Sequence, residues 1–419
     1  MSRYSYLSHL ECARCGEVHD TRIRQGLCRE CQSPLLARYD LTALAAEVPR
    51  SALDSRPWEL WRYHELLPSS AAEEEVHLGE VVTPLLKMQE YAGLLGLRNL
   101  WLKDESATPT STFKARGAAV GVSRARELRV PAIAMPTNGN AGAAWAAYAA
   151  RAQLPALIVM PADAPVVTRA ECVAFGAQLH LVDGVISDAG AMVAAAVKDA
   201  AWVDVATLKE PYRIEGKKTM ALEIVEQLGW ELPDVIVYPT GGGVGLIGIY
   251  KAITEMLELG WVQGQLPRFV AVQSSGCAPI VEAFERGDSE SKFWSDSNTV
   301  AFGINVPKAL GDFIILEDLY RSNGCAIAVS DADLLAELRI VGEQEGVFLC
   351  PEGAAAMAAV RRLTMQEWIG PDECVVVLNT GAGVKYPGTI DTDLPVLPAG
   401  TALPPSGPVD SAETESDRR

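Results

Sequence analysis

Short apolar runs alternate with longer Ala-rich segments along most of the chain, from about residue 78 to residue 395. The short runs are rich in β-branched residues and are apolar at nearly every position, which is typical of strands buried on both faces of a sheet. The longer segments have helical character. We expect strands at 131–135, 156–160, 178–182, 234–238, 268–273 and 374–379, and helices at 142–151, 217–228 and 354–363.

This order of elements predicts an α/β fold, because strand and helix in repeated alternation imply crossover connections and mostly parallel sheets. Two flanking segments differ from this pattern. Residues 41–75 form an acidic segment with helical character, and residues 396–419 are rich in Pro, Gly, Ser and acidic side chains. The composition of the second segment predicts a disordered tail.

Composition and charge narrow the class of protein. The chain has 419 residues, with 36 basic against 54 acidic side chains and a formal net charge of -18. This acidic balance argues against a nucleic-acid-binding protein. The first residues lack the apolar core of a signal peptide, and turn residues interrupt the uncharged stretches, so we expect neither export nor a membrane helix. We therefore expect a cytoplasmic protein whose nine cysteines are thiols or metal ligands.

Four of the cysteines form two pairs near the N-terminus. Cys12 and Cys15 are separated by two residues, and so are Cys28 and Cys31. Two such knuckles place four thiolates around one zinc ion, and the spacing predicts a structural zinc ribbon that supports folding rather than catalysis. A ribbon without metal, or thiols that pair only on oxidation, is the alternative, and His19 is a competing ligand.

A run of glycines follows the expected strand at 234–238. Gly241, Gly242, Gly243, Val244 and Gly245 precede an expected helix at 246–258. Exposed backbone N–H groups and the helix dipole make such a turn an anion site, although a tight packing turn has the same composition. Gly243, Gly245 and Gly248 also match the dinucleotide spacing, but the next strand ends in Gln273 rather than an acid, which weakens that interpretation.

Two polar residues stand at expected helix starts. Lys114 follows a polar turn, and a lysine at a helix N-terminus is unfavourable against the dipole. A lowered amine pKa there would favour a Schiff base, although a surface lysine is the commoner outcome for such a residue alone. Asn140 follows the strand at 131–135, and its local sequence favours a helix cap.

Six blocks together resemble the pyridoxal-phosphate (PLP) enzymes of the tryptophan-synthase-β type (fold type II), most closely the threonine synthases. They occur in the family's order. The blocks are KDESATPTSTFKARG (103–117), TNGNAGAAWAAYAARA (137–152), EGKKTMALEIVEQLGW (215–230), YPTGGGVGLIG (238–248), GVFLCPEGAAAMA (346–358) and LNTGAGVKYP (378–387).

The resemblance implies roles for single residues. Lys114 matches the lysine that forms the Schiff base, and Asn140 the asparagine bound to the cofactor's phenolic oxygen. Thr380 matches the hydroxyl that faces the pyridine nitrogen. Residues 241–245 match the loop that holds the cofactor phosphate. Arg213 and Lys217 are weaker candidates for substrate contacts, and for Lys217 a surface ion pair is favoured.

The resemblance also implies the domain organisation. We expect a zinc-ribbon-like segment at 1–40, a helical linker at 41–77 and a catalytic body at 78–395 in two interleaved lobes, the smaller at about 118–204. A homodimer is expected by analogy. Several family positions differ here: Ser111 and Ala115 before and after Lys114, Asn138, Cys350 and Ala382. Because these positions shape substrate recognition, the cofactor is predicted more firmly than the substrate.

The implied reaction converts O-phosphohomoserine and water into threonine and phosphate through a Lys114 Schiff base. One alternative with the same cofactor is an ammonia-lyase or dehydratase acting on serine, threonine or diaminopropionate, and another is β-replacement on phosphoserine. Two alternatives lack this chemistry: an NAD-dependent oxidoreductase that uses the turn at Gly243, and a zinc-ribbon binding protein with an inert enzyme domain.

Overall fold

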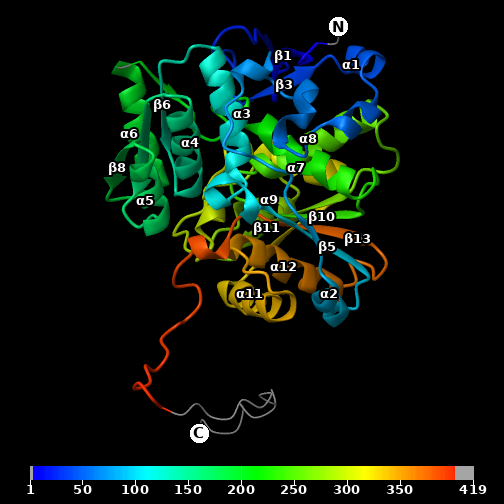
Figure 1. Ribbon diagram of the computed structural model, residues 1–419, viewed down its shortest axis with the longest axis vertical. Helices are drawn as coiled ribbons and strands as arrows, with labels where there is room; N and C mark the ends of the chain where they lie inside the picture. Colours follow the sequence, from blue (N-terminus) through cyan, green and yellow to red (C-terminus); the bar gives the residue numbers. More distant parts are fainter. Residues whose placement is uncertain (1–2, 200, 402–419) are drawn as a thin grey trace. The chain divides into compact units, whose positions relative to one another are not determined.

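Two sheets contain all the strands that the sequence predicts in the computed structural model, which describes residues 3–199 and 201–401 (Figure 1). The larger has the order β12-β11-β10-β13-β5-β4, and the smaller the order β8-β7-β6-β9. Neighbouring strands pair in parallel, except that β4 is antiparallel to β5. The larger sheet comprises β4 (Leu85–Lys87), β5 (Asn99–Asp104), β10 (Val235–Pro239), β11 (Arg268–Ser274), β12 (Cys325–Val329) and β13 (Cys374–Asn379). The smaller comprises β6 (Ala132–Pro136), β7 (Ala156–Pro161), β8 (Gln178–Val182) and β9 (Trp202–Asp204).

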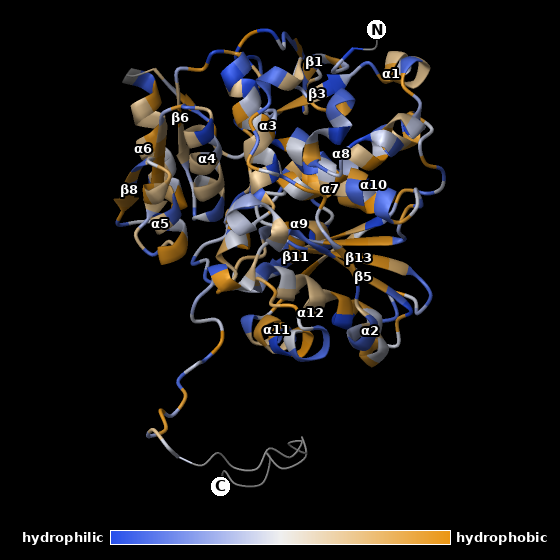
Figure 2. Cartoon of the chain, in the orientation of Figure 1, coloured by the Kyte–Doolittle hydropathy of each residue, from blue (hydrophilic) through white to orange (hydrophobic). Residues whose placement is uncertain are grey.

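Helices cover both faces of the larger sheet. Figure 1 shows α7 (Arg213–Gln227) and α8 (Val244–Glu258) on one side, and α2 (Gln89–Leu95), α11 (Asp331–Glu345) and α12 (Pro351–Met365) on the other. The strands between these layers are strongly hydrophobic (Figure 2), and all five residues of β10 are buried. The covered faces explain why the central strand β10, with the sequence VIVYP, lacks a charged position. Two further helices, α9 (Pro279–Arg286) and α10 (Asp312–Arg321), contact β11 and β12.

Helix α3 (Lys114–Glu127) lies between the helices of the two sheets. It packs on α4 (Asn140–Arg151), which covers the smaller sheet, and on α7, which covers the larger. Beside the smaller sheet, α6 (Ile186–Asp199) packs on β6, β7 and β9, and α5 (Val166–Ala174) contacts α4 and β8. None of the helices in the described ranges is both long and apolar enough to cross a lipid bilayer.

The N-terminal segment forms a separate three-stranded antiparallel sheet of order β2-β1-β3. Its strands are β1 (Leu7–Cys12), β2 (Val18–His19) and β3 (Leu35–Tyr39). The helical character expected for 41–75 is confirmed only at α1 (Leu41–Glu47). Three 3-10 segments follow, η1 (Arg50–Ser55), η2 (Leu60–Leu66) and η3 (Ala72–Glu74), because Pro49, Pro57 and Pro68 interrupt the helical backbone.

The chain divides into two units between Pro387 and Gly388. All of the described helices and strands lie in the first unit, and residues 388–401 contain neither. Residues 402–419, most of the predicted disordered tail, lie outside the described residues. The boundaries expected for the ribbon, the linker and the two lobes stay predictions.

Candidate functional site

The predicted site residues follow the carboxyl ends of neighbouring strands. The glycine turn follows β10, Thr380 follows β13, and the segment leading to Lys114 follows β5. These three strands are adjacent in the larger sheet, in the order β10-β13-β5. Because parallel strands end at one edge of their sheet, the chain brings these residues to the same edge. Asn140 reaches them from the smaller sheet, after β6.

Lys114 is the first residue of α3, and its position is fixed through Phe113. The Phe113 N–H donates to the Thr380 carbonyl at 3.0 Å, which ties the start of the helix to the end of β13. The Lys114 amine lies 4.4 Å from the centroid of the Phe113 ring and donates no hydrogen bond to any residue that the structure describes. Desolvation of the amine and the nearby Arg213 cation lower the pKa of Lys114 to about 8, while Glu352 opposes the shift.

The turn before Lys114 holds unusual backbone. Thr110 and Ser111 have φ values of 61° and 53°, a left-handed conformation that is rare for a β-branched residue such as threonine. The Thr110 and Thr112 hydroxyls are buried without a hydrogen-bond partner among the described residues. Strain and unpaired hydroxyls together are typical of a segment that is shaped to meet a ligand.

The glycine turn closes tightly on its surroundings. Gly243 has a φ of 74°, and a Cβ there would lie 2.1 Å from Ile315 Cδ1. A Cβ on Gly245 would lie 1.8 Å from the Tyr238 hydroxyl. The N–H groups of Gly242, Gly243 and Val244 donate to no other described residue. Uncapped N–H groups at the start of α8 are therefore available to an anion. That residues 241–245 hold a phosphate stays a prediction.

Asn140 is the first residue of α4 and is buried. The expected cap is wrong, because the Thr137 hydroxyl accepts from the N–H groups of Gly139 and Gly142 at 3.1 and 3.2 Å. The Asn140 side chain instead donates from Nδ2 to the Tyr386 hydroxyl at 3.0 Å. Its Oδ1 atom is buried without a partner in the described part of the chain, so the amide keeps capacity for a ligand.

Thr380 is buried directly after β13. Its hydroxyl lies 3.6 Å from the Cys350 thiol, which also donates to Asn379 Oδ1 at 3.3 Å. Cys350 is the N-cap of α12, where its sulfur accepts from the Gly353 N–H. The Cys350 thiol, at a position that differs from the family pattern, therefore packs against the hydroxyl expected to face the cofactor.

Arg213 and Lys217 lie one turn apart at the start of α7. The surface ion pair expected for Lys217 is wrong: the residue is 3% exposed, and its amine donates to the Phe113 carbonyl. Burial and the neighbouring Lys114 amine lower the pKa of Lys217 well below its usual range. Lys217 is buried because Gly117 and Gly248 let α7 approach α3 and α8 closely, which its sequence context did not show.

Sequence reasoning assigned no role to two buried residues of this site. Glu352, at the start of α12, accepts from the Gly303 N–H at 2.7 Å through Oε1, and its Oε2 has no partner in the described ranges. Tyr386 is the acceptor for Asn140 and follows η7 (Gly383–Lys385). Both residues lie in blocks that carry the family resemblance. The signal at Glu352 was an acid in the first turn of a helix, where a capping role is the usual explanation.

A buried network of ion pairs connects the elements next to Lys114. Arg116, two residues after Lys114, binds Glu105 and Glu223, and Lys103 on β5 binds Glu223 at 2.7 Å. Burial acts against the charged form, but Arg116 and Lys103 outweigh it and lower the pKa of Glu223 to about 2. These ion pairs fix the positions of β5, α3 and α7 relative to one another.

The four N-terminal cysteines converge, with all four Sγ atoms within 4.8 Å of one another. The Cys12–Cys31 and Cys15–Cys28 sulfur pairs lie 3.3 and 3.7 Å apart. Four sulfurs at tetrahedral Zn–S distances lie about 3.8 Å apart, so the cluster fits a zinc ion. His19 is not part of the cluster.

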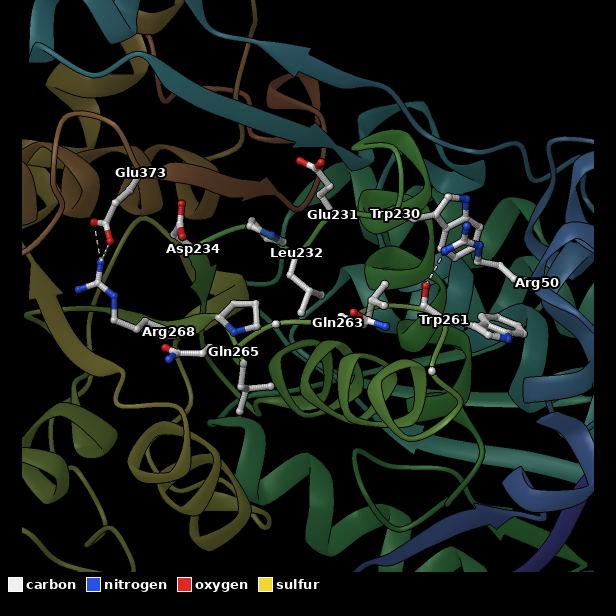
Figure 3. A pocket seen from close by; sticks show the side chains of 16 residues that line it. Arg50, Trp230, Glu231, Leu232, Asp234, Trp261, Gln263, Gln265, Arg268 and Glu373 are labelled. Atoms are coloured by element: carbon white, nitrogen blue, oxygen red, sulfur yellow. Dashed lines mark hydrogen bonds and ion pairs between the residues drawn. The ribbon is translucent and has the colours of Figure 1, made fainter.

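A pocket with a volume of about 710 Å³ is formed by other residues. Figure 3 shows the side chains that line it. Arg50, Trp230 and Trp261 line it together with residues at the amino ends of β10 and β11. The Arg50 guanidinium lies over the Trp230 ring and donates to the Trp261 carbonyl. None of the predicted site residues lines this pocket, because they follow the opposite ends of the strands.

The family described as pyridoxal-phosphate dependent enzyme matches residues 76–381. The chain is also similar to threonine synthase of Methanocaldococcus jannaschii, with 32% identity over 90% of this chain and 92% of that protein. Threonine synthase of Methanosarcina acetivorans is 32% identical over 91% of this chain and 93% of that protein. Threonine synthase of Mycobacterium bovis is 31% identical over 81% of this chain and 92% of that protein.

Solved structures with a similar fold include maize serine racemase, with a TM-score of 0.63 and 22% identity over 72% of this chain and 88% of that chain. A fungal L-serine ammonia-lyase from Rhizomucor miehei has a TM-score of 0.62 and 23% identity, over 74% of this chain and 95% of that chain. At these identities the likeness concerns the fold, an α/β fold of type II with parallel sheets.

Proposed function

Because the chain belongs to the family of pyridoxal-phosphate-dependent enzymes and its relatives are threonine synthases, we propose that it converts O-phosphohomoserine and water into threonine and phosphate. The family makes it a lyase that uses PLP. The observation that carries the proposal is the unpaired amine of Lys114, which stands where the ends of β10, β13 and β5 meet.

The site residues fit the cofactor. When bound, pyridoxal phosphate forms a Schiff base with an amine and delocalises the electron pair left by a departing α-proton. The uncapped N–H groups after Gly241 suit its phosphate. Asn140 Nδ2 gives one hydrogen to Tyr386, and its second hydrogen suits the ring oxygen. The Thr380 hydroxyl suits the pyridine nitrogen, which a neutral partner leaves mostly unprotonated. Lys114 holds the cofactor and, once released by the substrate amine, removes the α-proton as a general base.

The reaction needs a second anion site, for the phosphate of the substrate. Lys114, Lys217 and Arg213 form a cationic cluster in which Glu210, 3.8 Å from Arg213, is the only paired carboxylate among the described residues. A phosphate group would compensate these charges. We propose that Arg213 and Lys217 bind the substrate phosphate, because charge-assisted hydrogen bonds to phosphate are strong in a buried site.

The chemistry balances as elimination of phosphate followed by addition of water. The bond between Cγ and oxygen would break, the phosphate would leave with the electron pair, and Cγ would gain a proton in place of the one that Cβ loses. Water would add its hydroxyl to Cβ and give its proton to the phosphate, and the proton that Lys114 removed would return to the α-carbon. Arg213 and Lys217 would stabilise the phosphate as its charge increases.

The test is product analysis with purified protein, PLP and O-phosphohomoserine. We expect equal amounts of phosphate and threonine, a loss of at least ~1,000-fold in Lys114→Ala, and no change in Lys87→Ala, which alters an exposed lysine. Ammonia and a keto acid from serine, threonine or diaminopropionate would favour the ammonia-lyase. Replacement of the phosphate of phosphoserine would favour β-replacement. Nicotinamide binding without a coloured cofactor would overturn the PLP assignment.

Borohydride reduction tests the cofactor position independently of the substrate. Reduction should bleach the visible band and fix the cofactor to Lys114, as peptide mass spectrometry would show. Lys217 is an alternative amine, because its Nζ and that of Lys114 both lie 4.4 Å from the centroid of the Phe113 ring. Fixation to any lysine other than Lys114 would contradict the assignment.

We also propose that Cys12, Cys15, Cys28 and Cys31 bind one structural zinc ion, on the strength of their convergent sulfurs. Metal analysis of protein with reduced thiols should find one zinc per chain, lost in Cys12→Ser. We further propose a cytoplasmic homodimer that binds a small phosphorylated amino acid and neither nucleic acid nor membrane. Light scattering tests the oligomeric state.

A further inference from the structure

Lys385 is a buried lysine to which the proposed reaction gives no part. It is the last residue of η7, the short segment after Thr380, and it is 2% exposed. Its amine donates to the Thr110 carbonyl at 2.9 Å and to both carboxylate oxygens of Glu171, at 2.9 and 2.7 Å. An ammonium group has three N–H donors, so these three acceptors use its full capacity.

The two partners of Lys385 belong to segments that lie far apart in the chain. Thr110 is in η5 (Pro109–Ser111), the turn before Lys114, and this turn contacts α4. Glu171 is on α5, beside the smaller sheet (Figure 1). Lys385 itself comes from the segment after β13 of the larger sheet. One amine therefore connects both sheets to the turn that leads to Lys114.

The backbone of this turn depends on its surroundings because it is strained. Thr110 has a φ of 61° and a ψ of 15°, a left-handed conformation that persists in a β-branched residue only where the neighbouring structure enforces it. The Ala382 N–H holds the next residue by donating to the Ser111 carbonyl at 2.9 Å. That bond does not involve Thr110, whose carbonyl accepts from Lys385. The Lys385 amine is therefore the contact that fixes the strained residue itself.

The charge on the Lys385 amine depends on Glu171. Burial lowers the pKa of Lys385, while the hydrogen bonds and the charge of Glu171 oppose that shift. The side chains of the pair are 3% and 22% exposed, and charge-assisted hydrogen bonds are strong where water has little access. Removal of either partner leaves the other charge uncompensated. Loss of Glu171 should therefore also weaken the bond from Lys385 to Thr110.

We propose that Lys385, with Glu171 as its counter-ion, is a positioning residue that fixes the turn before Lys114 and thereby the place of the Lys114 amine. Its effect on turnover rests on the proposed function, whereas its hold on the turn does not. Lys385 acts through the Thr110 carbonyl and not on the reacting atoms. Because Glu171 belongs to α5, the pair also makes the turn depend on the position of the smaller sheet.

Hydrogen exchange of the holoenzyme, measured by mass spectrometry of its peptides, tests the hold on the turn. In Lys385→Met, peptides that cover residues 105–113 and 380–386 should exchange at least ~10-fold faster than in the wild type. Glu171→Gln should change the same peptides in the same direction but less, and in both variants β10 should exchange as in the wild type. Glu373→Gln is the matched control. Both oxygens of that carboxylate bind Arg268, at 2.7 and 2.6 Å, at the opposite ends of the strands, so the turn should not change.

Turnover of O-phosphohomoserine per bound cofactor tests the consequence for Lys114. Lys385→Met should lower kcat at least ~10-fold, because a reacting group that is out of place loses the advantage of orientation. Glu171→Gln should lower it less. KM should change by less than ~3-fold in both variants, since the groups proposed to bind the substrate phosphate are intact. Expressing the rate per bound cofactor removes any loss of folded protein from the comparison, and Glu373→Gln should match the wild type.

The two measurements separate the ways in which the proposal can fail. Unchanged exchange at residues 105–113, or faster exchange that includes β10 to the same extent, would overturn the positioning role. Faster exchange of the turn with an unchanged kcat would also overturn it, because Lys114 would then not depend on the turn. A wild-type protein that binds no cofactor, or binds it on another lysine, would overturn the proposed function instead. If Lys385→Met does not fold, the near-isosteric Glu171→Gln decides.

Discussion

At the scale of single residues, the decisive feature is a pair of lysine amines beside one phenyl ring, with Lys217 buried and Lys114 partly exposed. Lys114 and Lys217 each lie 4.4 Å from the centroid of the Phe113 ring, and Arg213 is close enough to lower the pKa of both. An amine is a nucleophile only when it is neutral. The cluster therefore keeps a useful fraction of Lys114 neutral near physiological pH.

The first prediction concerns the reactivity of Lys114 in cofactor-free protein. Its labelling by an amine reagent should rise with pH through a midpoint near 8, the pKa set by desolvation and Arg213. Arg213→Gln removes a neighbouring positive charge, which stabilises the ammonium, so the midpoint should move to higher pH. Pulse labelling with mass spectrometry measures this, and Arg286→Gln on the exposed face of α9 is the control. A midpoint that stays in place would contradict the electrostatic cause.

At the scale of elements, the strand–turn–helix unit of β10 and α8 leaves no space for side chains at its glycines. A second prediction follows for Gly245→Ala, whose added methyl would lie 1.8 Å from the Tyr238 hydroxyl. The turn must shift, and PLP affinity should fall at least ~10-fold, which is about 1.4 kcal/mol. Titration of the apoprotein followed by absorbance measures it. Gly190→Ala on α6, where a Cβ meets nothing within 4 Å, should bind like the wild type.

A third prediction concerns the ion network that joins β5, α3 and α7. Glu223→Gln leaves Arg116 and Lys103 buried without their shared partner, so the free energy of unfolding should fall by about 3 kcal/mol. Because the pKa of Glu223 is lowered to about 2, its contribution is present above the pKa of the unfolded chain and is lost as pH falls from about 4 toward 2. Urea unfolding measures both effects. Glu74→Gln, in an exposed pair 3.9 Å long, should change stability by less than ~0.5 kcal/mol.

Elements with unambiguous patterns were predictable from sequence. Each expected strand is confirmed to within one residue at either end. A short run that is apolar at nearly every position is stable only where both of its faces are covered, as in the interior of a parallel sheet. Strand β5 was not predicted, because the charged Lys103 interrupts its apolar run. The Lys103 amine is buried through contacts with distant residues, namely Glu223, Gln227 and the Thr83 carbonyl. Glu352 and Tyr386 were missed because their hydrogen bonds, to Gly303 and Asn140, join distant segments of the chain.

At the scale of the whole molecule, the N-terminal ribbon is tied to the catalytic body. The Thr21 carbonyl accepts from Arg124 on α3 and from the Tyr212 hydroxyl, and the Tyr39 ring lies 4.0 Å from the Lys218 amine on α7. The ribbon thus contacts the two helices that carry Lys114 and Lys217. Its folding should influence the stability of the site.

The fourth prediction is that zinc removal destabilises the entire protein. A chelator, or Cys28→Ser, should lower Tm by about 5 °C or more, because metal binding contributes directly to folding. Added zinc should restore the wild type but not the variant. Cys325→Ser, outside the ribbon, is the matched control. Equal Tm values with and without chelator would show that the ribbon is stable without metal.

The position of β13 in the larger sheet has a consequence for biosynthesis. Strand β5 precedes the whole smaller sheet in the chain, yet its only parallel neighbour is β13, which comes from the far end of the first unit. During translation β5 therefore leaves the ribosome long before its partner exists. The edge of β5 that pairs with β13 therefore stays unpaired, and either exposed or bound by a chaperone, until β13 has been synthesised. Ribosome-bound chains that stop before residue 374 should accordingly remain sensitive to protease around β5, and chains released at full length should not.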